Sequence, residues 1–399
     1  MDAPLLMTRR IVILELTAVS WLLASLAGCG APETATESRT LRLASATRHV
    51  KVYFERGRFG GWPANHGIWI WGDEILVGFS KGYYKDLGDR HHIDREKPEA
   101  HMLARSLDGG ETWVVEDPGA KGYLITAGDI LHGTDRPGIE VPELMDSTGG
   151  INFVHPDFAM ALRTDSVDAG TGRFFYSYDR GRTWAGPYRL PNFGAPGIAP
   201  RTDYIVNGVS DCMIFLTAAK SDAEEGRPLC ARTTDGGKTW TRISWIGPEP
   251  RGFSIMPASV RLSPTEILVA TRHREGPRRW IQAYLSTDDG ASWSELSTPV
   301  PDAGIGNPPA MIRLADGRIC LMYGFRGEPY SIRATLSADN GRTWGDETLL
   351  RADGSSRDIG YVRAVQRPDG KVVAVYYFSD DHTGPERYIA ATIWDPDGE

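Results

Sequence analysis

Short apolar segments alternate with polar turns along most of the chain. Residues 253–272, 305–326 and 358–378 share one layout, in which an apolar segment, a turn that is usually Asp-Gly, and a second apolar segment follow one another. This layout is typical of a β-hairpin. Residues 60–79 are a looser fourth example. The pattern predicts an all-β chain built from repeated hairpins.

A second repeat reinforces the first. Five octapeptides follow the pattern Ser/Thr-x-Asp-x-Gly-x-x-Trp, and they begin at Ser106, Ser177, Thr233, Ser286 and Ser337. The hydroxyl and the carboxylate can accept hydrogen bonds from backbone N–H groups of a tight turn. Glycine supplies a positive φ, and the Trp buries a large apolar surface. Each octapeptide, an Asp box, therefore predicts one hairpin between two strands.

The spacing of the Asp boxes predicts the architecture. Successive boxes start 71, 56, 53 and 51 residues apart, and a propeller blade of four short strands takes about 40–50 residues. Five boxes and a last segment without a box (358–398) indicate a six-bladed β-propeller of four-stranded antiparallel blades over residues 41–399. Residues 41–54 would supply the strand that closes the ring and protects the sheet edges.

The N-terminus predicts export. Arg9 and Arg10 precede an apolar run over residues 11–26, and Leu26-Ala27-Gly28-Cys29 forms a lipobox. We therefore expect residues 1–28 to be a lipoprotein signal peptide, Cys29 to be lipidated, and residues 29–40 to be a polar tether. A plain signal peptide with a chance cysteine is the alternative. The prediction is a membrane-anchored exported protein, periplasmic or at the cell surface, with the outer membrane favoured.

Composition narrows the ligand classes. The net charge of −8 gives no basic surface for nucleic acid. Three cysteines follow Cys29, namely Cys212, Cys230 and Cys320. Because their number is odd, at least one thiol stays free, and we expect these thiols to be buried. No Cys or His spacing resembles a zinc site. We expect neither a metal nor a cofactor.

Propeller geometry selects the face where chemistry can lie. If the strands of a blade are named A to D from the centre outward, A-strand starts, B-strand ends and B–C loops share one face, and the Asp boxes lie on the other. Tyr361 opens the last A strand, and Arg272 and Arg326 close the B strands of blades 4 and 5. His66 and His155 fall near the A-strand starts of blades 1 and 2. All five are candidate site residues.

Five Asp boxes on six blades resemble the sialidase (neuraminidase, BNR-repeat) superfamily over about residues 48–398. The resemblance implies Tyr361 as the nucleophile, a departure from the two-carboxylate scheme of most glycosidases. It implies an acid/base Asp in the blade 1 B–C loop, best matched by Asp94, with Glu99 and His101 as rivals. Such an acid needs its pKa raised by burial to work near neutral pH.

The same resemblance implies an arginine triad that binds a sugar carboxylate through charge-assisted bonds. Arg272 and Arg326 match two of its members, and Arg333 is a rival for the second. Trp62 stands where the first arginine is expected, unless nearby Arg58 substitutes. Asn65, in the same stretch, joins the substrate-binding candidates.

One further departure concerns the glutamate that assists the tyrosine in the superfamily. It is expected at the start of blade 4, where residues 254–257 read Ser-Ile-Met-Pro and hold no acid.

Three hypotheses follow from these residues. The first is an exo-acting glycoside hydrolase that acts on an anionic sugar, sialic-acid-like or uronic. The second is a propeller polysaccharide lyase that uses His66 or His155 with Tyr361 in acid/base roles. The third is a non-catalytic glycan-binding lipoprotein of the cell surface. All three make a glycan the ligand and the membrane a partner through the lipid anchor.

Overall fold

The computed structural model describes residues 40–125 and 136–398. All the described residues belong to one compact unit, Arg39–Glu399. The expected signal peptide, the lipidated Cys29 and residues 29–39 of the expected tether lie outside the described residues. In the part of the chain that is described, no helix has the length and hydropathy needed to cross a bilayer.

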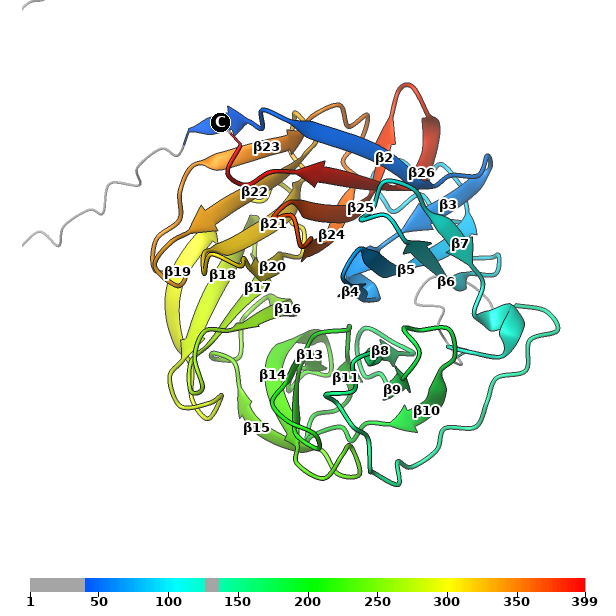
Figure 1. Cartoon of the computed structure of the whole chain (residues 1–399), viewed down its shortest axis with the longest axis vertical. Coiled ribbons are helices and arrows are strands. Elements are labelled where there is room, and N and C mark those ends of the chain that lie inside the picture. Colours follow the sequence, from blue (N-terminus) through cyan, green and yellow to red (C-terminus); the bar gives the residue numbers. More distant parts are fainter. Residues whose placement is uncertain (1–39, 126–135, 399) are drawn as a thin grey trace, which may run out of the picture. The chain divides into compact units, whose positions relative to one another are not determined.

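This unit is a ring of six small β-sheets, which confirms the predicted six-bladed propeller (Figure 1). Blade 1 consists of β3 (Arg58–Gly61), the 3-10 turn η1 (Pro63–Asn65), β4 (Ile68–Trp71), β5 (Glu74–Tyr83), β6 (Ala100–Ser106) and β7 (Val114–Glu116). A second 3-10 turn, η2 (Gly119–Lys121), follows it. Blade 2 consists of β8 (Ala159–Thr164), β9 (Gly172–Ser177) and β10 (Ala185–Arg189). Blade 3 consists of β11 (Ile198–Ala199), β12 (Tyr204–Val206), β13 (Cys212–Ala219), β14 (Glu225–Thr233) and β15 (Thr241–Trp245).

The remaining blades follow in chain order. Blade 4 consists of β16 (Phe253–Arg261), β17 (Ile267–Glu275), β18 (Arg278–Ser286) and β19 (Ser294–Val300). Blade 5 consists of β20 (Ala310–Arg313), β21 (Ile319–Phe325), β22 (Ser331–Ser337), β23 (Glu347–Arg351) and the added strand β1 (Leu41–Leu43). Blade 6 consists of β24 (Gly360–Gln366), β25 (Val372–Asp380), β26 (Gly384–Trp394) and β2 (Thr47–Tyr53).

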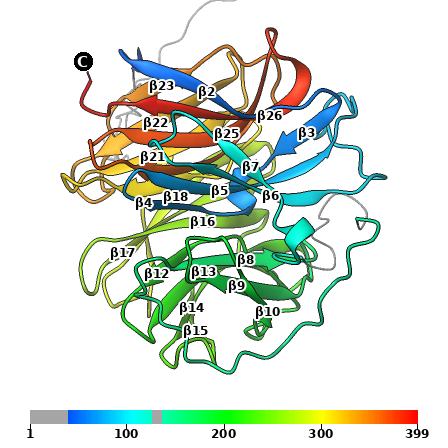
Figure 2. The same cartoon turned by 45° about the vertical axis from the view of Figure 1, so that its right-hand side comes forward.

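The N-terminal strand closes the ring, as the sequence predicts. β2 pairs antiparallel with β26, from Thr47 opposite Trp394 to Tyr53 opposite Ile389, and so becomes the outer strand of blade 6. β1 pairs parallel with β23 of blade 5. Figure 2 shows the blue N-terminal strand β2 beside the red C-terminal strand β26. The pairing of β2 with the last strand, β26, joins the two ends of the ring through backbone hydrogen bonds, which protects the sheet edges.

Blade 2 departs from the predicted four strands. The described residues give it three strands, and no A strand pairs with β8. Residues 151–158 form consecutive turns instead, in which His155 N–H donates to Asn152 O and Phe158 N–H donates to His155 O. The turns occupy N–H groups that a β-ladder would need, and Pro156 has no N–H group to donate. The segment therefore cannot form a strand.

The Asp boxes have one hydrogen-bond network repeated five times. In the fourth box the Gly290 N–H donates to the Ser286 hydroxyl at 2.8 Å, and Ser286 donates to Asp288 at 2.8 Å. The Ser292 N–H and hydroxyl both donate to the Asp288 carboxylate, at 2.8 and 2.6 Å. The other four boxes repeat these bonds at Asp108, Asp179, Asp235 and Asp339. Each box is thus a self-contained turn that fixes a C–D hairpin.

The core lies between neighbouring blades. Apolar side chains of the middle strands fill these interfaces, and β25 is buried along its whole length. Cys212, Cys230 and Cys320 are all buried and carry no disulfide. Burial raises the pKa of Cys320 to about 12, so this thiol stays protonated and acts as a small apolar side chain.

The acid sensitivity of the fold can be tested at Asp288. Hydrogen bonds from the Ser292 side chain and N–H and from Ser286 lower the pKa of Asp288 to about 2. A carboxyl whose folded pKa is lowered adds stability above its unfolded value of about 4 and loses it as the pH falls toward 2. Asp288→Asn is therefore expected to lower the melting temperature at neutral pH and to flatten its decline below about pH 4. Thermal unfolding across pH checks this, with exposed Asp381→Asn as the control; equal profiles for the two variants would contradict it.

Candidate functional site

Tyr361 lies where the inner strand of blade 6 begins, in a backbone conformation that its neighbours fix. Gly360 has φ 101° and Tyr361 has φ 51°, which an L side chain rarely adopts. The buried amide of Asn307 spans this point: it accepts from Tyr361 N–H at 2.8 Å and donates to Ile359 O at 2.9 Å. A Cβ on residue 360 would lie 2.4 Å from Asn307 Nδ2, so glycine is required.

Two other inner strands repeat this geometry. Trp62 in blade 1 and Met256 in blade 4 both have φ 55° near the start of their A strands. Met256 N–H donates to the Thr217 hydroxyl at 2.9 Å, much as Tyr361 N–H bonds to Asn307. Strained backbone of this kind persists only where the surroundings hold it, and it gathers at functional sites. The three positions all lie on the face of the ring opposite the Asp boxes.

Two arginines flank Tyr361. Arg272 Nη1 donates to the Tyr361 hydroxyl at 3.5 Å, and the Arg326 guanidinium lies 5.3 Å from the centre of the Tyr361 ring. The backbone holds Arg326 in place, because its Nε donates to Ile359 O at 2.9 Å. The structure therefore brings together the three residues that the sequence placed at the ends of different strands.

A buried carboxylate organises the rest of the cluster. Asp358 is 4% exposed and accepts from His91 Nδ1 at 2.6 Å, from Tyr377 Oη at 2.6 Å and from His92 N–H at 3.0 Å. Arg387 and Arg326 lie 3.4 and 3.9 Å from its oxygens. The His91 ring packs edge-on against Tyr361, with centroids 6.2 Å apart, and against Trp62, with centroids 5.3 Å apart. Asp358 thus links blade 6 to the blade 1 B–C loop.

The charges of these groups are set by burial and by their neighbours. Burial opposes ionisation of Asp358, but His91, Arg387 and Arg326 outweigh it and hold the pKa of Asp358 well below its usual range. Burial raises the pKa of Tyr377 well above the usual value, so this phenol remains a hydrogen-bond donor to Asp358. Burial also lowers the pKa of Arg272, which the Tyr361 hydroxyl partly offsets.

His66 lies deeper, in a fixed neutral form. Arg163 Nη1 donates to His66 Nδ1 at 2.8 Å, and because arginine cannot accept, Nδ1 must be the acceptor. The proton is then on Nε2, which donates to the Ser80 hydroxyl at 3.0 Å. Burial and the charge of Arg163 hold the pKa of His66 well below its usual value. His101 packs against it, with centroids 4.3 Å apart. His66 is 1% exposed, so neither ring nitrogen is placed to exchange protons with a substrate.

Asp94 is held within its own loop. Lys85 and Lys97 lie 3.3 and 3.7 Å from its carboxylate, and Glu96 N–H donates to it at 3.3 Å. Burial favours the neutral acid, but the Glu96 N–H and Lys85 outweigh it and lower the pKa of Asp94. That shift is opposite to the one a general acid needs near neutral pH. Its rival Glu99 is buried.

His155 lies on the opposite face from Tyr361. Its ring packs against Tyr178 of the second Asp box, with centroids 4.8 Å apart, and Asp157, two residues on, bonds to Arg180 of the same box. The expected position at an inner-strand start fails because blade 2 has no A strand among the described residues. His155 is therefore not part of the Tyr361 cluster.

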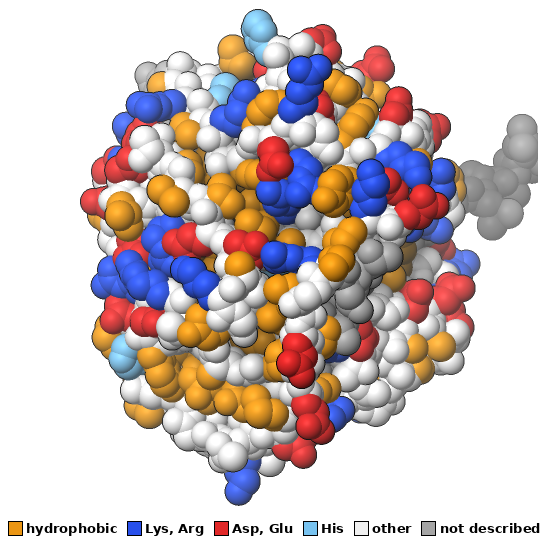
Figure 3. All heavy atoms as spheres, turned by 90° about the vertical axis from the view of Figure 1, so that its right-hand side faces the viewer, with side chains coloured by type: hydrophobic (Ala, Val, Ile, Leu, Met, Phe, Trp, Pro, Cys, Tyr) orange, Lys and Arg blue, Asp and Glu red, His pale blue; other side chains and the backbone are white. Residues whose placement is uncertain are grey.

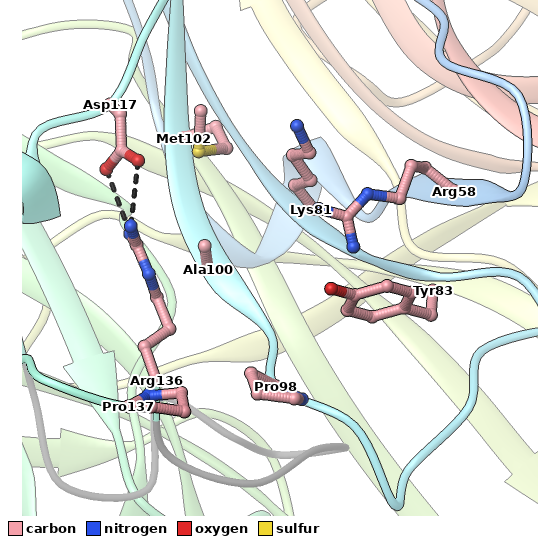
Figure 4. A pocket seen from close by; sticks show the side chains of 9 residues that line it. All are labelled: Arg58, Lys81, Tyr83, Pro98, Ala100, Met102, Asp117, Arg136 and Pro137. Carbon is pink, nitrogen blue, oxygen red and sulfur yellow. Dashed lines mark hydrogen bonds and ion pairs between the residues drawn. The ribbon is translucent and has the colours of Figure 1, made fainter.

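Arg58 lines a separate pocket of about 220 Å³ on blade 1 (Figure 4). Its guanidinium lies 3.8 Å from the centre of the Tyr83 ring. The cations of this pocket already have partners, because Glu55 binds both Arg58 and Lys81, and Asp117 binds Arg136. An anion would have to displace these carboxylates, so the pocket is a weaker candidate than the Tyr361 cluster.

The remaining two candidates, Arg333 and Asn65, bond to other residues of the propeller. Arg333 binds Glu347 at 2.9 Å and stacks on Phe325, which leaves Arg326 as the blade 5 arginine beside Tyr361. Asn65 is buried and accepts from Arg201 at 3.4 Å.

The sequence interpretation missed three residues. His91 and Asp358 form the centre of the cluster, and Glu225 at the start of β14 binds Arg201 at 2.8 Å and acts electrostatically on Arg272. All three lie on the face that the sequence selects for chemistry. His91 is in a B–C loop, Asp358 precedes an A strand, and Glu225 starts a C strand. Their positions along the chain could have identified them, although no sequence pattern favours His91 over Asp94.

Two further observations concern metal binding and surface charge. No group of three or more His, Cys, Asp or Glu side chains in the described ranges is arranged to hold a metal ion. Basic and acidic side chains are interspersed on the face of the molecule shown in Figure 3.

Known proteins share both the repeat and the fold. Residues 159–374, more than half of the chain, match the sequence profile described as a BNR repeat-like domain. No curated protein sequence matches significantly.

Solved structures extend the likeness to nearly the whole ring. A crystallised protein of unknown function from Dyadobacter fermentans has a TM-score of 0.66 and 18% identity, over 87% of this chain and 98% of that chain. The NanB sialidase of Streptococcus pneumoniae has a TM-score of 0.57 and 11% identity, over 90% of this chain and 71% of that one. An α-L-arabinanase of Penicillium chrysogenum has a TM-score of 0.53 and 13% identity, over 87% and 97%. At these identities the likeness shows the fold.

The role of Asp358 can be tested by stability. Asp358→Asn removes the charge that Arg326, Arg387 and His91 share, and breaking a buried ion pair costs about 3–5 kcal/mol. We expect urea denaturation to show a loss of this size. Asp86→Asn, which neutralises an exposed carboxylate 3.4 Å from His92 Nδ1, is the control and should cost less than about 1 kcal/mol. Similar losses in the two variants would show that Asp358 does not organise the cluster.

Proposed function

This chain belongs to the BNR repeat-like domain family, and we propose that it is an exo-acting glycoside hydrolase that cleaves an anionic glycan beside Tyr361. Its fold is similar to those of sialidases and arabinanases, which are glycoside hydrolases. One observation carries the proposal: on the face opposite the Asp boxes, the Tyr361 side chain lies beside two guanidinium groups, with Arg272 at its hydroxyl and Arg326 over its ring. We propose that the same chain is exported and anchored through a lipid on Cys29.

In the proposed reaction, a base takes the proton of the Tyr361 hydroxyl as the phenolic oxygen attacks the anomeric carbon of the terminal sugar. The C–O bond to the leaving group breaks as the bond to the Tyr361 oxygen forms, and an acid protonates the departing oxygen. Water then cleaves the glycosyl–tyrosine bond and restores the phenol. A neutral phenol suits an anionic sugar because it brings up no second anion. Arg272 and Arg326 would stabilise the negative charge that develops on the Tyr361 oxygen and bind the sugar's own anionic group.

We assign the acid/base role to His91 rather than Asp94. His91 packs against Tyr361, whereas Asp94 is engaged with Lys85 and Lys97. The hydrogen bond to Asp358 fixes His91 Nδ1 as a donor, which leaves the other ring nitrogen to exchange a proton. This is the arrangement of a histidine oriented by a buried carboxylate.

A second candidate function is β-elimination on a uronic-acid polymer, and the contact of His91 with Tyr361 favours it. A base would remove the proton beside the uronic carboxylate, the bond to the leaving oxygen would break, and an acid would protonate that oxygen. Histidine and tyrosine can fill these two roles, and an arginine would neutralise the carboxylate. His91 replaces His66 and His155 in this scheme, since His66 is enclosed and His155 lies on the other face.

The first test removes the nucleophile. Purified protein is incubated with aryl sialosides, uronosides and rhamnosides, and the phenol released is measured. Tyr361→Phe keeps the ring and its packing but loses the attacking oxygen, so kcat should fall at least about a hundredfold. Tyr330→Phe, on a hydroxyl that bonds to Glu328, is the matched control and should keep its activity. Full activity in Tyr361→Phe would contradict hydrolysis through this residue, and no release from any substrate would contradict the proposed activity itself.

The second test distinguishes the two candidate acid/base residues, His91 and Asp94, and the two candidate reactions, hydrolysis and elimination. His91→Gln should lower kcat about a hundredfold or more and remove one limb of its pH profile, whereas Asp94→Asn should change kcat less than about threefold. The reverse order would return the acid/base role to Asp94. With uronic-acid polymers as substrate, a product that absorbs in the ultraviolet indicates elimination, and new reducing ends without that absorbance indicate hydrolysis.

A further inference from the structure

A row of cations extends from the Tyr361 cluster along the rim of blade 4. The hairpin of β17 and β18 pairs Arg274 directly with Arg279 and Arg272 with Ile281. Because directly opposed residues of an antiparallel pair point to the same side, Arg272, Arg274 and Arg279 share one face of the sheet. Their strand ends lie on the face of the ring where Tyr361 lies.

This arrangement of like charges is electrostatically unfavourable. Like charges directly opposite each other on neighbouring strands destabilise the sheet. Burial, Arg274 and Arg272, in that order, lower the pKa of Arg279. Among the described residues, the acceptors of the Arg279 guanidinium are two backbone carbonyls, Gly276 O at 2.5 Å and Arg278 O at 3.0 Å. Among the described residues no carboxylate forms an ion pair with Arg272, Arg274 or Arg279, whereas most arginines of this protein have one.

An aromatic ring joins the row to the catalytic face. Phe253, at the start of β16, is opposite Arg274 in the sheet. The guanidinium groups of Arg272 and Arg274 lie 5.4 and 5.3 Å from the centre of its half-buried ring. Arg272 in turn donates to Tyr361. The positive charge is therefore continuous from Tyr361 outward.

We propose that Arg274 and Arg279, together with Arg272 and next to Phe253, form a second anion-binding subsite, so that the substrate is a glycan with acidic groups on adjacent sugars. This inference rests on the proposed function of the Tyr361 cluster. A carboxylate or sulfate on the neighbouring sugar would relieve the repulsion within the row and accept charge-assisted bonds. Phe253 offers an apolar surface beside the same sugar.

The same hairpin provides a matched control. Arg278 is next to Arg279 in the chain, but its guanidinium lies 4.3 Å from the centre of the Trp280 ring, on the other side of the sheet. On that side Glu275, opposite Arg278, binds Arg251 at 2.8 Å. Arg278→Gln removes one positive charge from the same hairpin without touching the proposed subsite.

The first experiment uses inorganic sulfate and needs no knowledge of the sugar. Thermal unfolding is followed while sodium sulfate replaces sodium chloride at constant ionic strength. The wild type and Arg278→Gln should gain melting temperature as sulfate rises, and Arg274→Gln/Arg279→Gln should gain much less, because a bound ligand stabilises only a protein that keeps its site. At low salt without sulfate, the double variant should melt no lower than the wild type, since two repelling charges are gone. Equal sulfate responses in all three proteins would overturn the subsite.

The second experiment tests the substrate class by calorimetric titration. In the Tyr361→Phe background, which prevents turnover, trigalacturonate and trisialic acid are compared with the methyl glycosides of the single sugars. The double substitution should weaken binding of the trimer it recognises about tenfold or more and binding of the single sugar less than about twofold. A trimer bound equally well by both proteins would overturn the inference while leaving the proposed function standing. A sulfate response without binding of any acidic sugar would leave the anion subsite standing and count against the proposed function.

Discussion

The pairing of β2 with β26 is the constraint on which the rest of this structure depends. A propeller blade contacts only its two neighbours, so the ring holds its geometry only if the first and last segments of the chain meet. Here they meet inside one sheet, with Thr47 opposite Trp394 and six aligned pairs along the strand. That pairing places blade 6 against blade 1, and the His91–Asp358 bond crosses this seam. The candidate site therefore lies over the point where the ring closes.

The site combines fixed backbone with fixed charge. Asn307 holds Tyr361 in a left-handed conformation, and Asp358 gathers His91, Tyr377, Arg326 and Arg387 around one buried carboxylate. His91 comes from blade 1 and Arg326 from blade 5, whereas Tyr377 and Arg387 belong to blade 6, so the complete network forms only in the closed ring. Such an arrangement is preorganised: the hydrogen bonds that orient a histidine or a tyrosine are formed before a substrate arrives.

Three guanidinium groups without a carboxylate partner among the described residues lie on the face that carries Tyr361, in a chain whose net charge is negative. Asp358 forms ion pairs with Arg326 and Arg387, and Glu225 forms one with Arg201. Arg272, Arg274 and Arg279 form no ion pair among the described residues. A local excess of positive charge on an acidic protein is costly to maintain, and a negatively charged ligand is the simplest physical reason to keep it.

The sequence by itself determined what local turn chemistry controls. Each Asp box makes these hydrogen bonds within eight residues, so its conformation can be predicted without knowledge of the neighbouring blades. The five boxes therefore predicted five hairpins and, together with the last segment that lacks a box, the number of blades. The sequence also placed Tyr361, Arg272 and Arg326 on one face, because the direction of successive strands alternates within every blade. The boxes mark the face away from the site and say nothing about its chemistry.

Only the tertiary structure decided which side chains meet. His91 and Asp358 are 267 residues apart, and the choice between His91 and Asp94 depends on how the blade 1 loop crosses to blade 6, which no local pattern encodes. His155 lies on the other face because turns replace the inner strand of blade 2. His66 is a fixed structural residue because Arg163 of the next blade binds it. Long-range packing, rather than residue type, set these outcomes.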